Sequence, residues 1–390
     1  MIGSRAGCVG RFRFKNFEPK CPVFPDSHDQ SPRWSERPRK ATIYRVARDL
    51  GESDSFSPVL ARRCVFLMPA SENATVPDSR ETQSVRRGPV LVACDGSTAS
   101  QESLFNAARL GAISFGGPIE ILGVCEPTPA VSAGMDVIPA PIELDELRRA
   151  SMLDDIRRTI SVSAVGDPSW AVDVKIGSTS RTLAEEASTR NASVLVMGIG
   201  RHNPLDRLFG TETSLATLRE SSVPVLAVGL NFPARPQHVV VGMDFSAASL
   251  HSARMAIEML ATDGLLTLVH VRPRFEHPSA DWQAWDADYG KTLPPLFEQI
   301  RAQLKVPSTL RVETVTVRGD PAPALLAYAN QVNADLIALG TQRHGFIERL
   351  VVGSVATRVM RTARCAVLAV PAAAAAVART MVSHETRQVA

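Results

Sequence analysis

Cysteine is scarce in this sequence, and its cysteines form no recognisable motif. No two of the six form a Cys-x-x-Cys pair. The six are Cys8, Cys21, Cys64, Cys94, Cys125 and Cys365. We expect the last three to lie in buried strands, where a free cysteine behaves as a small apolar residue. This usage is typical of a reducing compartment and predicts a cytoplasmic protein.

Long hydrophobic runs and a strong charge of one sign are also missing. No apolar run approaches the roughly 18 residues of a membrane-spanning helix, and the start of the chain lacks the apolar segment of a secretory signal. The net charge is only +3, with six excess positive charges in residues 1–88 and three excess negative charges in the remainder. We therefore expect neither a membrane nor a nucleic acid as a partner.

Familiar catalytic motifs are absent as well. The chain has no Gly-x4-Gly-Lys-Ser/Thr P-loop, no nucleophile elbow and no zinc-ligand spacing. His202 and His344 occupy matching loops, where a lone histidine is more often a surface or capping residue than a catalyst. We predict no catalytic residue and no efficient enzyme activity.

The chain does contain an internal sequence repeat. PVLVACDGS at 89–97 matches HVVVGMDFS at 238–246, and a second apolar run with a glycine-bearing loop follows at 194–211 and at 336–354. A period near 140 residues is too long for a solenoid repeat and indicates two copies of one domain. From Gly177, which matches Gly319, the copies match at an offset of 142, and from the last loop glycine at 143, so the first copy lacks one loop residue.

Near-continuous apolar strands alternate with helices in both copies, as in parallel sheets covered on both faces. This predicts an α/β protein of two tandem doubly wound parallel-sheet domains of Rossmann-like type. We expect the domains at 88–230 and 238–371, with a flexible tail at 372–390. The expected helices are 98–114, 142–162, 180–191, 211–222, 247–262, 285–304, 321–333 and 354–363. The expected strands are 89–94, 118–125, 170–176, 193–198, 223–229, 238–243, 265–271, 310–317, 335–340 and 366–371.

Residues 1–87 are rich in proline, serine and arginine and show no sustained helical or strand period. Three interpretations stay open. The segment is a disordered tail; or it is not part of the natural product, since Met68 precedes a short polar lead into the first strand; or it is a functional basic arm.

Asp95 and Asp244 each end a first strand, at the sheet edge where open parallel sheets bind ligands. One interpretation is that they form turns and helix caps together with Ser97 and Ser246. The other is that each carboxylate holds Mg²⁺ beside phosphate groups, because Mg²⁺ takes one or two carboxylates plus phosphate oxygens.

The loop of the second copy runs from Gly340 to Gly353-Ser354. Glycines let backbone amides approach an anion, and the amides that open a helix bind phosphate. Glycines also simply make turns, so their spacing alone is a weak signal. A strand-ending Asp, a glycine loop and a Gly-Ser helix start in one domain, in this order, form a stronger one.

DGSTAS at 95–100 and the segments 318–340 and 353–370 resemble universal stress proteins of the nucleotide α-hydrolase fold type. The resemblance covers about 89–371 as a tandem pair. It implies a last-strand pairing across an internal two-fold axis, an internal pseudo-dimer, and leaves a homodimer open.

Many members of that family bind ATP through a loop of pattern Gly-x2-Gly-x9-Gly-Ser/Thr. For the second copy the resemblance implies ATP and Mg²⁺ at a group of residues around the strand ends. These are Met243 and Val271 near the base and ribose, Asp244 at the metal, Gly340, Gly353 and Ser354 in the loop pattern, and Val355 near the phosphates. Arg343 replaces the second glycine, and Gly345 compensates two residues later.

The first copy departs further from the pattern. Asp95 stands at its metal position, but Gly198 and Gly210 are 12 residues apart instead of 13. Arg201 replaces the second glycine, next to Gly200.

Pro204 stiffens the same loop, and Glu212 follows Thr211 where phosphates are expected. A carboxylate there repels ATP, so we expect the second copy to bind ATP more tightly than the first.

These observations predict a tandem universal stress protein that binds adenine nucleotide in the stress response and hydrolyses ATP slowly at most. A nucleotide-independent protein-interaction module of the same fold is the alternative. An enzyme of a related nucleotide α-hydrolase type is a third hypothesis.

Overall fold

The computed structural model describes the two repeated segments and most of their loops. The described residues are 88–97, 101–128, 131–133, 136–138, 142–199, 211–274, 279–341, 353–372 and 374. The expected extension at 1–87 lies outside them, as does the expected tail apart from residues 372 and 374.

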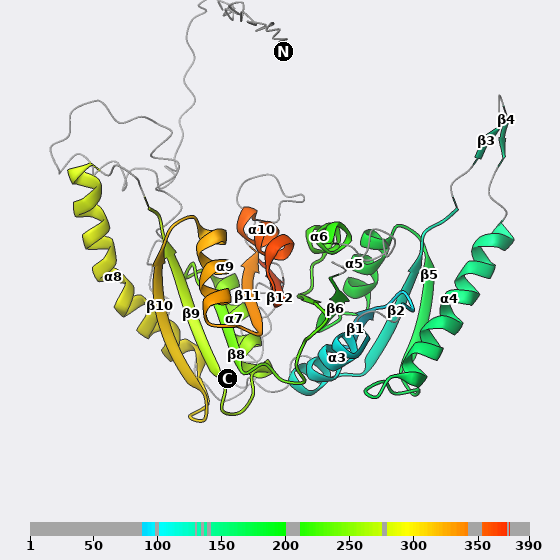
Figure 1. Cartoon of the computed structure of the whole chain (residues 1–390), viewed down its shortest axis with the longest axis horizontal. Coiled ribbons are helices and arrows are strands. Elements are labelled where there is room, and N and C mark those ends of the chain that lie inside the picture. The colour runs from blue at the N-terminus through cyan, green and yellow to red at the C-terminus, as the bar shows by residue number, and fades with distance from the viewer. Residues whose placement is uncertain are drawn as a thin grey trace, which may run out of the picture. The chain divides into compact units, whose positions relative to one another are not determined.

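The described chain builds one ten-stranded sheet in the order β10-β9-β8-β11-β12-β7-β6-β1-β2-β5 (Figure 1). The first copy supplies β1 (Val90–Ala93), β2 (Ile119–Cys125), β5 (Ala171–Ile176), β6 (Val194–Gly198) and β7 (Val225–Val228). The second supplies β8 (His238–Gly242), β9 (Leu265–Arg272), β10 (Arg311–Arg318), β11 (Leu336–Thr341) and β12 (Ala366–Pro371). All neighbours pair in parallel except β7 and β12, so the predicted doubly wound α/β fold is confirmed.

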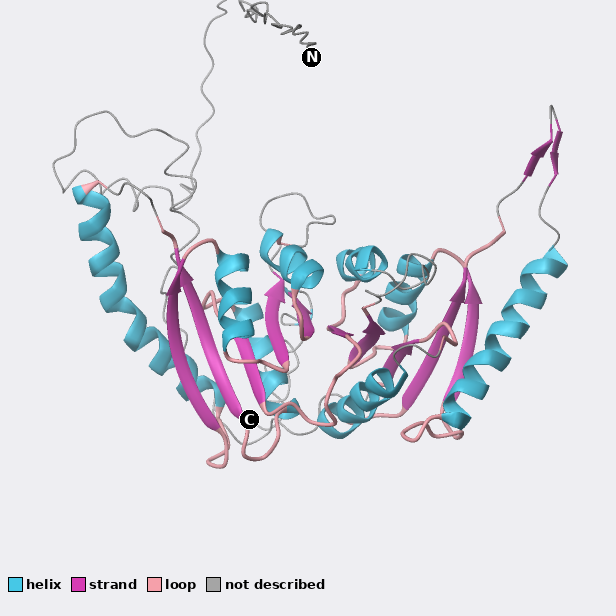
Figure 2. Cartoon of the chain, in the orientation of Figure 1, coloured by secondary structure: helices cyan, strands magenta, loops and turns pink. Residues whose placement is uncertain are grey.

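Helices cover both faces of this sheet, as Figure 2 shows. One hydrophobic cluster joins the sheet to α3 (Gln101–Phe115), α4 (Ile142–Val162), α7 (Ala247–Met259) and α8 (Ala280–Leu304). The other joins it to α5 (Thr179–Thr189), α6 (Thr211–Glu220), α9 (Pro321–Gln331) and α10 (Ser354–Thr362). Because both faces are covered, strands such as β1, β7 and β12 are buried at every residue.

The two copies meet along their last strands. β7 and β12 pair antiparallel, with Leu226 opposite Leu368, so the predicted pairing of the last strands is confirmed. Through this pairing the two parallel halves form one continuous sheet.

Some boundaries differ from the sequence prediction. α8 begins five residues before the expected start, because the Ser279 hydroxyl caps it by accepting a hydrogen bond from the Trp282 amide at 3.2 Å. α5 begins at Thr179, one residue before the expected start, with Ser178 as its N-cap. Cys365 is half-buried and precedes β12, whereas Cys94 and Cys125 are buried as expected.

A small hairpin was not predicted. It consists of β3 (Val131–Ala133) and β4 (Asp136–Ile138), which pair antiparallel outside the main sheet. Strands of three residues carry too few side chains for an apolar period to be visible in the sequence.

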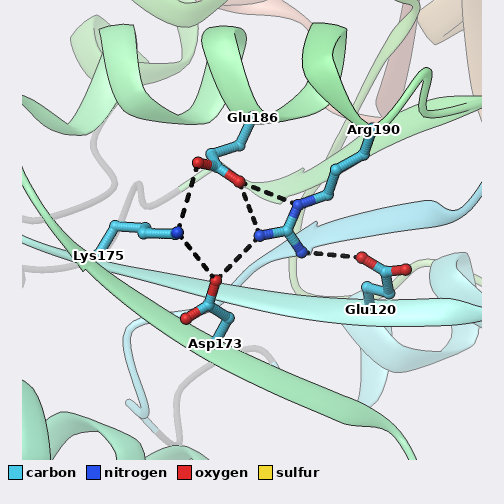
Figure 3. A network of polar contacts seen from close by, with 5 residues as sticks. All are labelled: Glu120, Asp173, Lys175, Glu186 and Arg190. Atoms are coloured by element: carbon cyan, nitrogen blue, oxygen red, sulfur yellow. Dashed lines mark hydrogen bonds and ion pairs between the residues drawn. The ribbon is translucent and has the colours of Figure 1, made fainter.

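Five charged side chains tie the edge strand β5 to β2 and α5 (Figure 3). Arg190 at the end of α5 donates to Glu120 on β2 at 2.8 Å, to Asp173 on β5 at 3.0 Å and to Glu186 on α5 at 2.7 Å. Lys175 on β5 lies 3.5 Å from Asp173 and 3.7 Å from Glu186. The network fastens the outermost strand through polar contacts where the hydrophobic core ends.

Within the described residues, no helix combines the length and the apolar character needed to cross a bilayer.

Candidate functional site

The site expected in the second copy lies at the point where the strand order reverses. From β8 the chain proceeds to β9 and β10 on one side and then to β11 and β12 on the other. β8 and β11 are parallel neighbours, with Gly242 opposite Leu339, so their carboxyl ends meet at one edge. Ligands of open α/β sheets bind at such a switch point. The fold thus brings Asp244, Gly340 and Thr341 to one edge of the sheet.

Asp244 forms the turn between β8 and α7. Its Oδ1 accepts hydrogen bonds from the Ser246 amide at 3.0 Å and the Ser246 hydroxyl at 2.5 Å. Ser246 is the N-cap of α7, and its hydroxyl oxygen accepts from the Ser249 amide at 3.2 Å. The turn-and-cap interpretation is therefore confirmed for this pair. Among the described residues no hydrogen bond engages Asp244 Oδ2, and the side chain is exposed, so one carboxylate oxygen faces solvent.

The first copy repeats the turn in a simpler form. The Ser97 amide donates to Asp95 Oδ1 at 2.9 Å. Gly96 between them has a φ of +77°, in the left-handed region that glycine favours.

Gly340 has a structural role that needs no ligand. A Cβ at this position would lie 2.5 Å from the Ala248 carbonyl carbon and 2.5 Å from the Ser249 amide nitrogen. Only a glycine lets the end of β11 approach the first turn of α7 this closely. Packing against the start of α7 therefore explains the glycine.

Gly353 and Ser354 begin α10. Gly353 is the N-cap, with φ −54° and ψ 145°, and its carbonyl accepts from the Thr357 amide at 3.1 Å. Any residue adopts this conformation, so the backbone does not require glycine here. The amides of Ser354 and Val355 open the helix, where intrahelical acceptors are missing.

Met243 and Val271 lie on opposite faces of the sheet. Met243 is buried in the cluster beneath α7 and α8, and its amide donates to the Val269 carbonyl at 2.8 Å. Val271 is half-buried against the cluster beneath α9 and α10. Their side chains therefore flank the edge from different layers.

Part of the predicted site lies outside the described residues. This applies to Arg343, Gly345, Gly200 and Gly210 and to the side chain of Thr211. Gly198 ends β6, and the Ser214 hydroxyl donates to its carbonyl at 3.5 Å. Among the described residues, no three His, Cys, Asp or Glu side chains are grouped to hold a metal ion.

Glu212 at the start of α6 forms an ion pair with Arg361. Arg361 on α10 of the other copy lies 2.9 Å from its Oε1 and donates to its Oε2 at 3.1 Å. The positive partner offsets the repulsion of a phosphate that the sequence alone predicts for Glu212. Because both side chains are largely exposed, solvent weakens the pair.

The sequence interpretation missed a buried polar group directly behind Asp244. His270 on β9 is only 3 % exposed, and its Nδ1 donates to the Met243 carbonyl at 2.7 Å. Its Nε2 lies 3.0 Å from the Tyr289 hydroxyl on α8. Burial lowers the pKa of His270, although the hydrogen bond to Met243 and the charge of Asp244 oppose this shift. A lone histidine inside the apolar run LLTLVHVR was the one available signal.

Phe245 lies against the same histidine. Its φ is +62°, a left-handed value that is uncommon for a bulky side chain. Its ring centroid is 4.9 Å from that of His270 and 5.3 Å from that of Phe297. No sequence pattern announces this conformation, because propensity disfavours it.

Arg272, Arg318 and Asp286 form a group of charged side chains at the same end of β9 and β10. Arg272 and Arg318 end paired strands, and both donate to the buried carboxylate of Asp286 on α8, Arg318 at 2.6 Å. Arg272 also lies over the ring of Tyr289, 5.9 Å from its centroid. These contacts anchor the first turns of α8 over the strand ends.

Comparison with known sequences identifies the class of protein to which this arrangement belongs. The sequence profile of the universal stress protein family matches the chain twice, at residues 87–229 and 236–371. The chain belongs to the universal stress protein family, as a tandem member with two such units.

Curated relatives agree with this assignment. The chain is 23 % identical over 295 residues to a universal stress protein of Mycolicibacterium smegmatis, covering 74 % of this chain and 98 % of the relative. It is 30 % identical over 144 residues to universal stress protein A homolog 1 of Coxiella burnetii, covering 36 % of this chain and 94 % of the relative. A third match, to a universal stress protein of Methanocaldococcus jannaschii, is 39 % identical over 61 residues and spans 16 % of this chain and 36 % of the relative.

Among solved structures, a universal stress protein of Archaeoglobus fulgidus matches with 20 % identity and a TM-score of 0.48, over 73 % of this chain and 97 % of that one.

Proposed function

We propose that this tandem universal stress protein binds an adenine nucleotide, ATP with Mg²⁺, in the stress response, and that its second copy supplies the tighter site. The observation that carries the proposal is the juxtaposition at the switch point. The exposed carboxylate of Asp244 lies at the edge to which Gly340 and Thr341 also belong. The buried thiols of Cys94 and Cys125, neither of which is in a disulfide, support a reducing, cytoplasmic setting.

The donor set suits a magnesium–nucleotide complex better than a metal held by protein alone. Asp244 offers one uncommitted carboxylate oxygen, and the described residues provide no group of three metal-binding side chains. Mg²⁺ in nucleotide sites takes one or two carboxylates and completes its shell with phosphate oxygens and water. Asp244 would hold the ion in the second copy and Asp95 in the first, and the ion would neutralise phosphate charge.

The helix start of α10 suits the phosphates. The amides of Ser354 and Val355 lack helical acceptors, and the partial positive charge of a helix N-terminus favours an anion. No side chain near Asp244 in the described residues is placed to activate water, since His270 is buried and engaged at both ring nitrogens. Any hydrolysis of ATP would therefore be slow.

Mass spectrometry of small molecules released from the purified full chain tests the proposal, followed by calorimetric titration with Mg-ATP. We expect a released adenine nucleotide, or saturable binding that Asp244→Asn weakens about tenfold, because a charged metal contact is lost. Ser97→Ala is the matched control: it removes a turn hydroxyl from the other copy and should leave the tighter phase unchanged. No binding at millimolar Mg-ATP would overturn the proposal.

A nucleotide-independent interaction module is the second candidate, and one observation favours it. Asp244, Ser246 and Gly340 all have roles in the turn, the cap or the packing that need no ligand. If wild-type protein and Asp244→Asn are equally stable and neither binds nucleotide, this candidate replaces the first.

A further inference from the structure

The turn that carries Asp244 is held from both sides by buried side chains, and its counterpart in the first copy is not. On one side, His270 donates to the carbonyl of the Met243–Asp244 peptide at 2.7 Å. On the other, the ring of Phe245 is fixed between His270 and Phe297. The hydrogen bond and the ring contacts therefore restrain the backbone on both sides of Asp244, and with it the direction of the Cα–Cβ bond of Asp244.

The left-handed conformation of Phe245 supports this assignment. Such a conformation is strained for a non-glycine residue and persists only where the surroundings impose it. At the equivalent position the first copy has Gly96, which adopts a φ of +77° and has no side chain that could pack against a neighbouring ring. The second copy thus accepts strain in order to place a ring against His270.

The strand register shows that the histidine is also specific to the second copy. Val90 lies opposite Ile119 and Val239 lies opposite Leu266, so Gly123 stands where His270 stands. A Cβ at Gly123 would lie 2.8 Å from the Ile156 side chain, which leaves no room for an imidazole. The first copy therefore lacks a counterpart of the hydrogen bond from His270 to the turn.

A hydrogen-bonded partner fixes the orientation of the imidazole. Because Nδ1 donates to a carbonyl, the neutral ring accepts at Nε2 from the Tyr289 hydroxyl. Tyr289 in turn stacks on Trp285 at 5.1 Å with an interplanar angle of 8°. The charged groups around the ring are Asp244 from the turn and Arg272 from its own strand, the latter paired with Asp286 on α8.

We propose that His270, with Tyr289 behind it, is a positioning residue that preorganises the Asp244 turn for the magnesium–nucleotide complex in the second copy. The inference rests on the proposed function and adds to it the device that distinguishes the two copies. A preorganised turn loses less conformational freedom on binding, so affinity rises without a new contact to the ligand.

The test compares His270→Leu with His270→Asn in the full chain. Leucine removes both hydrogen bonds, whereas the asparagine amide restores a donor near the Nδ1 position. The first measurement is Mg-ATP affinity in the tighter phase, identified as the phase that Asp244→Asn weakens. We expect a loss of about fivefold or more for leucine, about threefold or less for asparagine, and an intermediate loss for Tyr289→Phe.

His238→Leu is the matched control. It removes another histidine of the same strand pair, whose Nε2 lies 2.9 Å from the Thr267 hydroxyl at the opposite end of β8. We expect its affinity within about twofold of wild type. Hydrogen exchange without nucleotide gives an independent reading: amides of 243–250 should exchange faster in His270→Leu and at nearly the wild-type rate in His270→Asn.

Wild-type affinity in His270→Leu overturns the inference alone, as does an asparagine variant no better than leucine or an equal loss in His238→Leu. A wild-type chain that binds no Mg-ATP overturns the proposed function and this inference with it. If His270→Leu does not fold, the comparison of His270→Asn with Tyr289→Phe still tests the inference. The inference requires Tyr289→Phe to lose more Mg-ATP affinity than His270→Asn. Both variants must also show the wild-type melting transition.

Discussion

At the scale of single residues, the two copies form the same turn with different residues. Gly96 and Phe245 both follow the strand-ending Asp and both have a positive φ. The repeat in the sequence predicts that the turns correspond. It does not predict the left-handed Phe245, since only the packing of His270 and Phe297 around the ring stabilises that conformation.

Gly96→Ala should destabilise the protein. The left-handed conformation costs an L-residue about 1–2 kcal/mol, and the new Cβ would lie 3.0 Å from the Asp155 side chain and 3.3 Å from the Ile156 amide. We expect the free energy of unfolding, measured by urea titration, to fall by about 1–3 kcal/mol. Gly229→Ala is the control, because a Cβ there meets nothing within 4 Å. An equal effect of the two substitutions would contradict the prediction.

His270 should make stability depend on pH. Burial lowers its pKa in the folded protein, so between that value and about 6.5 the unfolded chain binds the proton and the folded chain does not. The contribution is therefore fully present above the unfolded pKa and is lost as pH falls through the folded pKa. Urea titrations from about pH 7.5 to 5 should show a smaller loss of stability in His270→Asn than in wild type. Parallel curves would contradict this.

At the scale of elements, the apolar runs predicted the ten strands of the sheet because continuous burial on two faces leaves a continuous apolar segment in the sequence. The helical period alone does not predict the start of α8, because the Ser279 cap sets it ahead of the first clearly periodic residues. The site was predictable as an edge of the sheet, with Asp244 and Gly340 at its strand ends. The packing role of Gly340 was not, since it depends on a backbone from another element.

Gly340→Ala and Gly353→Ala should separate packing from ligand binding. The Cβ at 340 would collide with the backbone of Ala248 and Ser249, so we expect a loss of about 1–3 kcal/mol in the free energy of unfolding. Gly353 has an ordinary conformation at the N-cap, so alanine there should cost only a few tenths up to about 1 kcal/mol. In Mg-ATP titrations Gly353→Ala should nevertheless weaken binding, because its methyl group adjoins the first amides of α10. A Gly353→Ala chain with wild-type affinity would contradict the phosphate assignment.

At the scale of the whole molecule, the two copies are inequivalent in their turns, their loops and their cross-copy contacts. We expect the first copy to bind Mg-ATP at least about tenfold more weakly than the second. Its loop is one residue shorter, and its turn lacks a counterpart of the hydrogen bond from His270. Calorimetry on full chains carrying Asp95→Asn or Asp244→Asn measures each site separately. Equal affinities would contradict the ranking.

Glu212→Gln isolates the contribution of charge to that ranking. Since Arg361 already pairs with Glu212, we expect the substitution to improve first-copy binding by no more than about threefold. A larger gain would show that the carboxylate, and not the loop length, limits this site.

The antiparallel joint between β7 and β12 has a kinetic consequence. Two separate chains that meet through their last strands dissociate on dilution and can exchange partners. Here residues 229–237 connect the two copies, so the encounter of their last strands is intramolecular, at an effective concentration of about millimolar or higher. Under the proposed ranking, this single chain would therefore carry one tighter and one weaker nucleotide site in every molecule, at any protein concentration.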